Sequence, residues 1–380
     1  MGFKGLLNIL AIAGVISAAN YKRVACPDGV HTATNDACCV FFSLADELQS
    51  SVFKNICFEE AHHALRLSFQ DAIGFSLQDG PTSGGGADGS IIIFENTELK
   101  DPANSGIDVA INDIAFLLQN FDVTAGDLIQ FAAAVGITNC PGYPRLEFFA
   151  GRPNGTVAAK SGLIPLPQDD VDEIFVRMQD AGFAPTELAS LLAAHSTGHS
   201  NTLIDNRIQV PFDTTPFTFD SQFYLEVLLK GNETLPPSSG EAGAQVPNAL
   251  AAQGEMRLQS DFAVSIHPQT ACAWQSFVNN QELMQSEFAA VMAKVAVVGQ
   301  DKSSMIDCSE AVPMPVPPVN KATSFPAGTG PEILQLVCNS PFPSLTTDPG
   351  QPTTIPECPD GDTNVNDCPP MKKRLKRRFN

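Results

Sequence analysis

The sequence predicts a mostly α-helical protein with an extended arm at its C-terminal end. Eight segments between residues 44 and 299 carry apolar residues at three- and four-residue spacing, the period of an amphipathic helix. Alternating patterns typical of strands are short and few. From about Val312 the chain is rich in proline and loses helical periodicity. We therefore expect an arm held to the helices by its cysteines, and not a separate domain.

The helical segments follow one another along the chain and several have typical ends. Thr124 or Asp122 is placed to cap the fourth segment, and Pro185 stands where the first turn of a helix tolerates proline. The predicted helices cover residues 44–53, 60–76, 107–121, 124–136, 171–182, 185–196, 219–231 and 281–299.

The first residues have the pattern of a secretory signal. Lys4 is followed by an apolar run from Leu6 to Ile16 and then by small residues, and Lys22-Arg23 is a dibasic cleavage motif. No later apolar run reaches the length of a membrane span. We expect residues 1–23 to be a signal peptide with a short pro-segment, and the mature protein to be secreted.

Cysteine usage agrees with secretion. The chain has ten cysteines, an even number, so five disulfides are expected in an oxidising compartment. There is no CxxC pair, which disfavours a zinc site. Two glycosylation sequons begin at Asn154 and Asn232. The cysteines are Cys26, Cys38, Cys39, Cys57, Cys140, Cys272, Cys308, Cys338, Cys358 and Cys368.

The charge is strongly acidic, with a formal net charge of −20 and a pI near 4.5. An acidic protein disfavours nucleic acids and anionic membranes as partners. The last ten residues are the exception, with six basic side chains between Lys372 and Arg378. This stretch is either a solvated tail, or a tether to the cell wall or another polyanion, or a further processing site.

Two of the predicted helices carry residues suited to chemistry. Residues 60–76 place Arg66 and Gln70 one turn apart, with Phe69 between them. Residues 185–196 place His195 on a leucine-rich face, where it is either a satisfied core residue or a neutral ligand of a metal or haem iron. Such a ligand needs a carboxylate to orient its ring, and Asp261 is the candidate.

Two oxygen-rich loops follow these helices. Hydroxyl, carboxylate and carbonyl oxygens are the ligands that calcium prefers, although such clusters are more often ordinary turns. Neither loop has EF-hand spacing, and the glycine run is not a phosphate loop because no Gly-Lys-Ser/Thr follows it. The first set is Asp71, Gly86, Asp88 and Ser90, and the second is Ser196, Asp213, Thr215, Thr218 and Asp220.

Several motifs together resemble a known family. In chain order they are EAHHALRLSFQDAI, GGGADGS, ANSGID, FAAAVGITNCPGYPRLEFFAGRPN, LLAAHSTGH, PFDTTPFTFD, GEMRLQSDFA and TACAWQSFVNNQ. Over roughly Val24 to Cys368 the chain resembles the secreted fungal class II haem peroxidases, the manganese and lignin peroxidase group, and most closely the manganese peroxidases.

The resemblance implies a two-lobed, all-α fold with haem b between a distal and a proximal helix, and two bound Ca²⁺. Hydrogen peroxide would be the oxidant and small aromatic compounds the reductants, and a monomer is expected. The haem peroxidase domain would span residues 24–311, with its distal half ending near residue 165. The arm would span 312–370 and the basic tail 371–380.

The resemblance also implies roles for single residues. His195 would be the axial ligand of the haem iron, with Asp261 as its partner, and Arg66 would stabilise charge on the peroxide. Phe69 and Phe212 would wall the haem pocket. The two oxygen-rich sets would be the distal and proximal calcium sites. The disulfides would be Cys26–Cys38, Cys39–Cys308, Cys57–Cys140, Cys272–Cys338 and Cys358–Cys368.

Gln70 departs from the family, which has a histidine at this position. That histidine moves a proton from one peroxide oxygen to the other, and glutamine does not titrate near neutral pH. The loss of a general base costs on the order of 10²–10⁴ in rate. Asn104 matches the residue that orients the missing histidine, so it is either a remnant or reused to hold Gln70.

A second departure concerns the reducing substrate. Glu59 matches the first of three carboxylates that bind Mn(II) in the family, but His63 and Asn201 replace the other two, and His199 replaces a supporting arginine. We expect no effective Mn(II) site, although a softer metal at Glu59 and His63 stays open. Ser190 stands where the lignin-oxidising branch has a surface tryptophan. The single tryptophan, Trp274, lies in a structural segment of the family, and the tyrosines are Tyr21, Tyr143 and Tyr224.

Two functions remain. The chain is either a peroxidase that oxidises phenolic, lignin-related compounds at the haem edge with strongly reduced peroxide activation, or a non-catalytic haem protein that scavenges or senses a ligand. A sequence error or rare allele at Gln70 is a third explanation, since His and Gln codons differ by one base.

Overall fold

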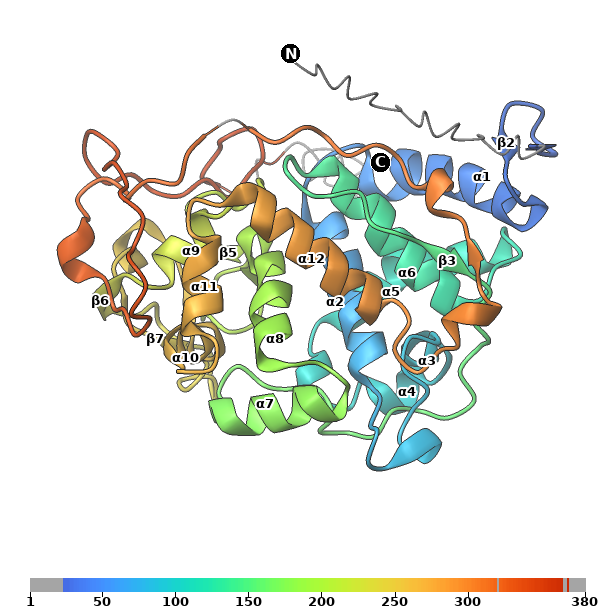
Figure 1. Cartoon of the computed structure of the whole chain (residues 1–380), viewed down its shortest axis with the longest axis horizontal. Helices are drawn as coiled ribbons and strands as arrows, with labels where there is room; N and C mark the ends of the chain where they lie inside the picture. Colours follow the sequence, from blue (N-terminus) through green and yellow to red (C-terminus); the bar gives the residue numbers. More distant parts are fainter. Residues whose placement is uncertain (1–22, 320, 365–367, 369–380) are drawn as a thin grey trace, which may run out of the picture.

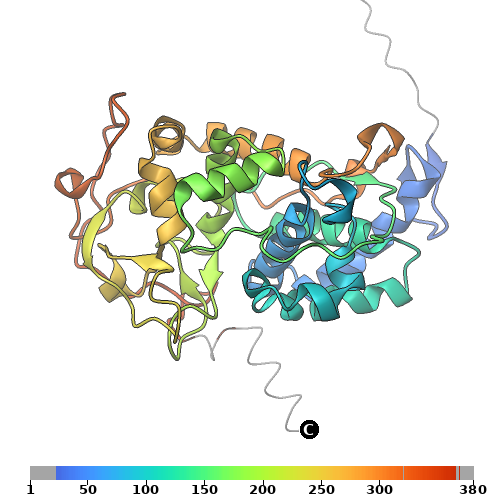
Figure 2. The same cartoon turned by 90° about the horizontal axis from the view of Figure 1, so that it is seen from below.

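Helices form almost all of the regular structure in this computed structural model, which describes residues 23–319, 321–364 and 368. They gather into two lobes, with the N-terminal helices in one and the later helices in the other (Figures 1 and 2). This confirms the predicted all-α class. The proposed signal peptide up to residue 22 and the basic tail lie outside the described residues.

The first lobe is built around α2, which carries the predicted distal residues. Each residue of α6 is buried, and α2 packs against α6 and α5. Thr124 caps α6 by accepting a hydrogen bond from the backbone N–H of Asp127 at 3.1 Å, as predicted. The helices of this lobe are α1 (Cys39–Glu47), the π-helical turn η2 (Leu48–Phe53), α2 (Glu59–Ile73), α3 (Ser90–Ile93), α4 (Glu95–Glu98), α5 (Ile107–Ile114) and α6 (Ala125–Gly136).

The second lobe surrounds α8, which carries the predicted proximal residues. The long helix α12 packs against both α8 and α2 and so ties the lobes together (Figure 1). The helices of this part are α7 (Val171–Asp180), α8 (Pro185–Leu191), its 3₁₀ continuation η7 (Leu192–Thr197), α9 (Gln222–Glu226), α10 (Gln259–Ile266), α11 (Ala271–Phe277) and α12 (Gln281–Val295).

The strands are short and form isolated antiparallel pairs. The pairs are β1 (Val24–Ala25) with β2 (Thr32–Ala33), β3 (Phe149–Ala150) with β9 (Ile306–Asp307), β4 (His199–Ser200) with β5 (Val210–Pro211), and β7 (Gln245–Val246) with β8 (Arg257–Leu258). The strand β6 (Lys230–Glu233) makes only bridge contacts with Asn248.

Two helix predictions differ from the structure. The segment 219–231 forms only the five residues of α9 and then enters β6, so its apolar spacing reflects a buried irregular segment more than a long helix. The helices α3, α4, α10 and α11 were not predicted, because segments of four to eight residues are too short to show a helical period clearly.

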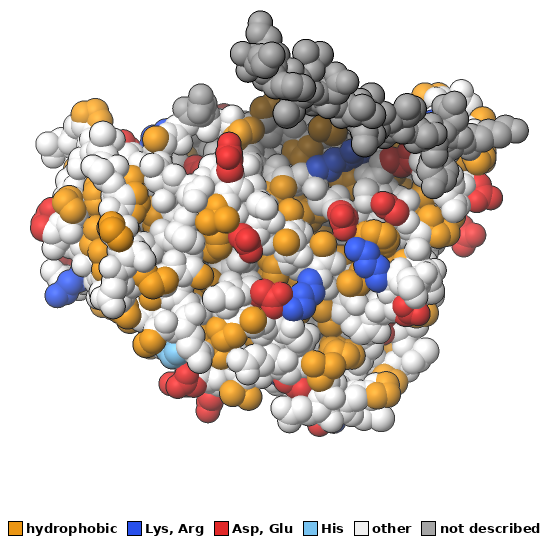
Figure 3. All heavy atoms as spheres, in the orientation of Figure 1, with side chains coloured by type: hydrophobic (Ala, Val, Ile, Leu, Met, Phe, Trp, Pro, Cys, Tyr) orange, Lys and Arg blue, Asp and Glu red, His pale blue; other side chains and the backbone are white. Residues whose placement is uncertain are grey.

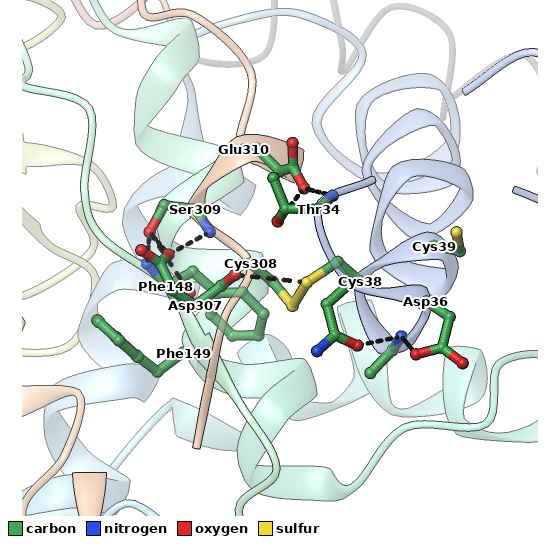
Figure 4. Close-up of a disulfide and its surroundings, with 12 residues drawn as sticks. Thr34, Asp36, Cys38, Cys39, Phe148, Phe149, Asp307, Cys308, Ser309 and Glu310 are labelled. Carbon is green, nitrogen blue, oxygen red and sulfur yellow. Dashed lines mark hydrogen bonds between the residues drawn. A yellow bond between two sulfur atoms is a disulfide. The ribbon is translucent and has the colours of Figure 1, made fainter. Parts of the chain in front are cut away.

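Two of the five predicted disulfides are wrong. Cys26 pairs with Cys39, and Cys38 pairs with Cys308, so the two adjacent cysteines exchange the expected partners (Figure 4). Neighbouring residues in a helical turn point about 100° apart. Cys38 ends the 3₁₀ turn η1 (Asp36–Cys38), is fully buried and lies against Asp307, whereas Cys39 begins α1 and points elsewhere (Figure 4).

The C-terminal arm runs along the outside of the helices, as predicted (Figure 1). It contains little regular structure beyond the 3₁₀ turn η11 (Pro331–Ile333). The disulfide between Cys272 and Cys338 ties it to α11, and the backbone N–H of Ile355 donates to the carbonyl of Gln253 at 3.0 Å. The buried side chain of Phe325 belongs to the main hydrophobic core, so this part of the arm packs on the helical domain.

The face drawn in Figure 3 carries many more acidic than basic side chains. The basic side chains on this face are scattered and form no patch. Both sequon asparagines, Asn154 and Asn232, are exposed. Within the described part of the chain, no helix combines the length and the apolar character needed to cross a bilayer.

Candidate active site

The proximal side of the candidate site is centred on His195, in the turn η7 that continues α8. Its Nδ1 atom lies 2.9 Å from Oδ2 of Asp261, which sits in the first turn of α10 and is fully buried. A buried carboxylate holds the proton on Nδ1, so Nε2 carries a free lone pair. The histidine side chain is 30% exposed although Phe212 and Asp261 beside it are buried, so the ring is not enclosed by the core.

Phe212 packs beside this histidine. The two ring centres are 5.3 Å apart. Gly198 makes this contact possible, because a Cβ atom there would lie 2.9 Å from the Phe212 ring and 3.0 Å from the Cα of His195. The glycine of the LAAHSTGH motif therefore serves the packing of the predicted proximal pair.

The distal side is centred on Arg66 in α2. Its guanidinium donates hydrogen bonds to the carbonyl oxygens of Ala103 and Ser105, each at 3.1 Å. Burial lowers its pKa to about 10, so the side chain stays charged at neutral pH. Its surface is nevertheless solvent-accessible. The guanidinium is thus held by the backbone and stays open to solvent.

Gln70 lies one turn further along α2 and is buried. Its Nε2 atom donates to the carbonyl oxygen of Ala103 at 2.9 Å, which leaves Oε1 without a hydrogen-bond partner. Asn104 donates instead to the carbonyl of Glu98 at 2.9 Å, and its Oδ1 is also unpartnered. A backbone carbonyl therefore holds the glutamine, and the hypothesis that the Asn104 side chain holds it is wrong. The carbonyl of Ala103 accepts from both Gln70 and Arg66.

The first oxygen-rich set joins Asp71, near the end of α2, to the loop around residues 86–90. Oδ2 of Asp71 accepts from the N–H of Gly89, and Oδ1 of Asp88 accepts from the N–H of Ser90, both at 3.0 Å. Burial, and then the nearby charge of Asp88, raises the pKa of Asp71. Gly86 has a φ of +83°, and a Cβ there would lie 2.3 Å from the carbonyl oxygen of Val298. The structure thus brings the four predicted residues into one turn region with two buried carboxylates.

The second oxygen-rich set is linked by hydrogen bonds among its own members. Ser196 donates to the carbonyl of Thr218 and accepts from the N–H of Asp220, both at 3.0 Å. Thr215 donates from its backbone to Asp213 at 2.8 Å and from its hydroxyl to Asp220 at 3.1 Å. Oδ2 of the fully buried Asp213 has no partner. An unpartnered buried carboxylate oxygen is what a cation ligand requires.

The residues at the predicted degenerate manganese site also lie close together. Asn201 donates from Nδ2 to Oε1 of Glu59 at 3.4 Å, and its own oxygen accepts from the N–H of Gln209 at 2.6 Å. Glu59, His63 and His199 each place a possible ligand atom within 4.8 Å of the other two. In the sequence His199 stands out only as the replacement of a supporting arginine, although the motifs EAHHAL and HSTGHS both contain paired histidines.

A third histidine, His62, packs against this group. Its Nδ1 lies 3.1 Å from Nδ1 of His199. Burial lowers the pKa of His62 to about 3, with a smaller contribution from His63, and burial also lowers the pKa of His199 well below its usual range. Both rings are therefore neutral at ordinary pH.

Aromatic residues that could relay electrons from the surface are buried in the described part of the chain. Trp274 is fully buried and donates to the carbonyl of Tyr224. The hydroxyls of Tyr143 and Tyr224 are bonded to Thr197 and to the carbonyl of Ala189. Ser190 is 5% exposed, so even this position is not on the surface.

Comparison with known proteins agrees with this geometry. Residues 44–280 match the family model described as Peroxidase, and residues 283–359 match the Fungal peroxidase extension region. The chain is 49% identical over 371 residues to Manganese peroxidase H4 of Phanerodontia chrysosporium, covering 95% of this chain and 97% of that protein. It is 45% identical over 345 residues to Versatile peroxidase VPS1 of Pleurotus eryngii, covering 89% and 92%.

Ligninase H2 of Phanerodontia chrysosporium is 44% identical over 370 residues, covering 94% of this chain and 98% of that protein. The similarity therefore includes manganese, versatile and lignin-active relatives and extends over both lobes and the arm. The chain belongs to the peroxidase family of oxidoreductases, in the fungal group that carries the extension region.

Proposed function

We propose that this chain is an extracellular haem peroxidase that oxidises phenolic, lignin-related compounds one electron at a time at the haem edge. We further propose that Gln70 strongly slows its reaction with hydrogen peroxide. The observation that carries the second part is the hydrogen bond from Nε2 of Gln70 to the carbonyl of Ala103. This hydrogen bond fixes the side-chain amide and leaves Oε1 without a hydrogen-bond partner.

The residues present fit haem. His195 offers a free Nε2, a buried carboxylate that raises the basicity of the ring, and a partly exposed side chain. Arg66 is held by two backbone carbonyls and is open to solvent. His195 would hold the haem iron, and Phe69 and Phe212 would wall the pocket. When bound, haem supplies the redox chemistry by which peroxide is reduced to water and the reductant is oxidised.

The side chains around the peroxide then decide how fast it reacts. Arg66 keeps its charge and is held by two carbonyls, so it can stabilise negative charge on a peroxide oxygen without reorganising. Oε1 of Gln70 can accept a hydrogen bond from the peroxide O–H, but it cannot take up the proton. The proton must therefore leave by way of solvent, and the reaction loses general-base assistance.

The route of electrons follows from which aromatic residues are exposed. In the described residues, the tryptophan and both tyrosines are buried, so no surface relay is available there. Asn201 offers a neutral amide oxygen that already accepts from Gln209, and His63 replaces a second carboxylate. We propose that Mn(II) is not an effective reductant and that small phenols react at the haem edge.

Two calcium ions would complete the fold, one at each oxygen-rich set. The unpartnered oxygen of Asp213 and the two buried carboxylates of the first set support this. We also propose a secreted monomer, in line with the five disulfides and the two exposed sequons. Nucleic acid and membranes are not expected partners, and the basic tail is proposed to contact polyanions.

A second candidate is a non-catalytic haem protein. The unpartnered oxygens of Gln70 and Asn104 favour it, because both are acceptors and neither titrates. Such a pocket can hold a neutral ligand that donates a hydrogen bond without reacting with it.

Turnover of the haem- and calcium-loaded full chain separates the two functions. We would measure oxidation of 2,6-dimethoxyphenol with hydrogen peroxide and with peracetic acid, which ionises more easily and needs the base less. Slow turnover with hydrogen peroxide and faster turnover with the peracid support the peroxidase. No turnover with either oxidant, in protein that binds haem, supports the non-catalytic alternative. Saturable oxidation of Mn(II) would contradict the proposal about the metal site.

A further inference from the structure

A cluster of one carboxylate and two imidazoles lies at the start of α2. Glu59 is the first residue of this helix and His63 follows one turn later on the same face, while His199 comes from β4 after the proximal turn. Their possible ligand atoms lie within 4.8 Å of one another. Ligands around a tetrahedral zinc ion with bonds of 2.0–2.1 Å are about 3.4 Å apart. Small side-chain rotations would therefore be enough to close the site.

The surroundings hold these ligands in place. Nδ1 of His199 contacts Nδ1 of His62, so Nε2 of His199 is left for another partner. His62 is itself wedged against the disulfide of Cys57, with its Nε2 3.6 Å from the sulfur. Asn201 donates to one oxygen of Glu59 and leaves the other available.

His63 has a polar atom that needs a partner. Its Nδ1 is buried without a hydrogen bond and lies 3.7 Å from Oδ2 of Asp113. A ligating histidine commonly donates its second ring N–H to a carboxylate, which fixes the ring and raises its basicity. Asp113 is positioned to accept that proton after a small approach.

The donor set selects the metal. Mn²⁺ and Ca²⁺ prefer oxygen ligands, and this group has one carboxylate and two nitrogens. Two histidines with one glutamate are a known zinc ligand set, and such a set keeps a fourth position for water. All three side chains are partly exposed, so an ion can reach them from solvent. The other group of similar composition, Cys57, His62 and Cys140, is closed by a disulfide.

We propose that Glu59, His63 and His199 bind one borderline divalent cation of the zinc class, with a fourth position left for water. The three donors are distinct from Arg66, Gln70 and His195, so this site can be tested apart from peroxide chemistry. Zinc binding and peroxidase turnover can therefore fail or succeed separately.

Calorimetric titration of the haem-loaded, calcium-saturated full chain tests this site. We expect one Zn²⁺ per chain, bound at least tenfold more tightly than Mn²⁺. The variants His63→Ala and His199→Ala should each weaken zinc binding by tenfold or more. The control His31→Ala removes a histidine that also pairs with a carboxylate, Asp28 at 2.8 Å, but far along the chain, and it should change affinity by less than twofold.

Electron paramagnetic resonance with one equivalent of Cu²⁺ reports the ligands directly. We expect coupling to two imidazole nitrogens in the wild type and to one in either alanine variant. His63→Gln and His199→Gln serve if an alanine variant loses its haem spectrum. The proposal is overturned if zinc does not bind saturably, if Mn²⁺ binds more tightly than zinc, or if both histidine substitutions leave zinc affinity unchanged.

Discussion

The two sides of the candidate site differ in the chemistry of their buried polar groups. On the proximal side His195 is bonded to a buried carboxylate, and the buried oxygens without a partner, Oδ2 of Asp213 and Oδ1 of Asp261, belong to carboxylates. On the distal side Arg66 is well held, but Gln70 and Asn104 each keep a buried oxygen without a partner.

The difference separates two requirements of a peroxidase. Holding haem depends on the proximal histidine and its carboxylate, and these are in place. Activating peroxide depends on a distal group that takes up a proton, and α2 offers an amide at that position. The packing of α2 against α5 and α6 does not depend on whether residue 70 can take up a proton, so the fold does not require a histidine there.

Gln70→His should give the distal side the titrating group that it lacks, and it should have the largest effect of the changes considered. A titrating base restored on α2 should raise the second-order rate constant with hydrogen peroxide on the order of 10²–10⁴-fold. Stopped-flow absorbance of the haem band measures this. Gln70→Ala is the control and should give no gain, since it removes the amide without supplying a base. An equal gain from alanine would mean that the amide obstructs peroxide and that proton transfer is not the limit.

Arg66→Leu should show that the distal residues act together. In the Gln70→His background the loss of the guanidinium should cost on the order of 10²-fold in the same rate constant, as for other charge-stabilising donors. In the wild type the cost should be larger, because only the hydroperoxide anion reacts there and no protonated histidine shares the stabilisation of its charge. Equal costs in both backgrounds would show that the two positions do not couple.

Removal of the disulfide between Cys26 and Cys39 should destabilise the protein by about 3 kcal/mol, the usual size for a short loop. The pair Cys26→Ser with Cys39→Ser should leave no free thiol. The pair Cys26→Ser with Cys38→Ser, matched to the connectivity that the structure rejects, should leave two. A thiol assay and urea unfolding measure both effects, and the reverse thiol counts would contradict the structure.

Calcium removal should destabilise the protein more at pH 7 than at pH 5. Burial raises the pKa of Asp71 and Asp213, one buried carboxylate from each oxygen-rich set. The calcium-free folded chain therefore binds protons that the unfolded chain has lost above about pH 4.5. Since the folded state binds more protons, its stability falls as pH rises. The buried histidines His62 and His199 act in the opposite sense, but equally with and without calcium.

Thermal unfolding with and without a chelator at the two pH values gives the free energy of unfolding in each case. The difference between the calcium-loaded and the calcium-free protein should be larger at pH 7 than at pH 5, by on the order of 1–2 kcal/mol. A difference that stays constant or shrinks as pH rises would mean that these carboxylates are not the calcium ligands.

Much of this architecture could be predicted from the sequence. The helical period placed α2, α6, α7 and α12 well, because each has a long apolar face. Asp261 was a candidate partner of His195 by residue type, and the resemblance to the peroxidase family paired the two, which lie 2.9 Å apart. The short helices α10 and α11 were missed for lack of length.

Other features left no signal in the sequence. Cys38 and Cys39 are adjacent, so only the direction of each side chain decides their partners. The carbonyl of Ala103, which accepts from both Gln70 and Arg66, is a backbone group that any residue would supply. The approach of His199 to His63 depends on how β4 folds back toward α2, and sequence spacing does not encode that distance.

The pH dependence of the reaction with hydrogen peroxide tests the central claim most directly. Without a distal base, the rate constant of the wild type should rise about tenfold per pH unit between about pH 4 and pH 8, because only the hydroperoxide anion reacts. Gln70→His should instead level off above the ordinary pKa of histidine, about 6.5. A wild-type profile that levels off in the same range would contradict the account, because another residue, such as His63, would then be taking up the proton.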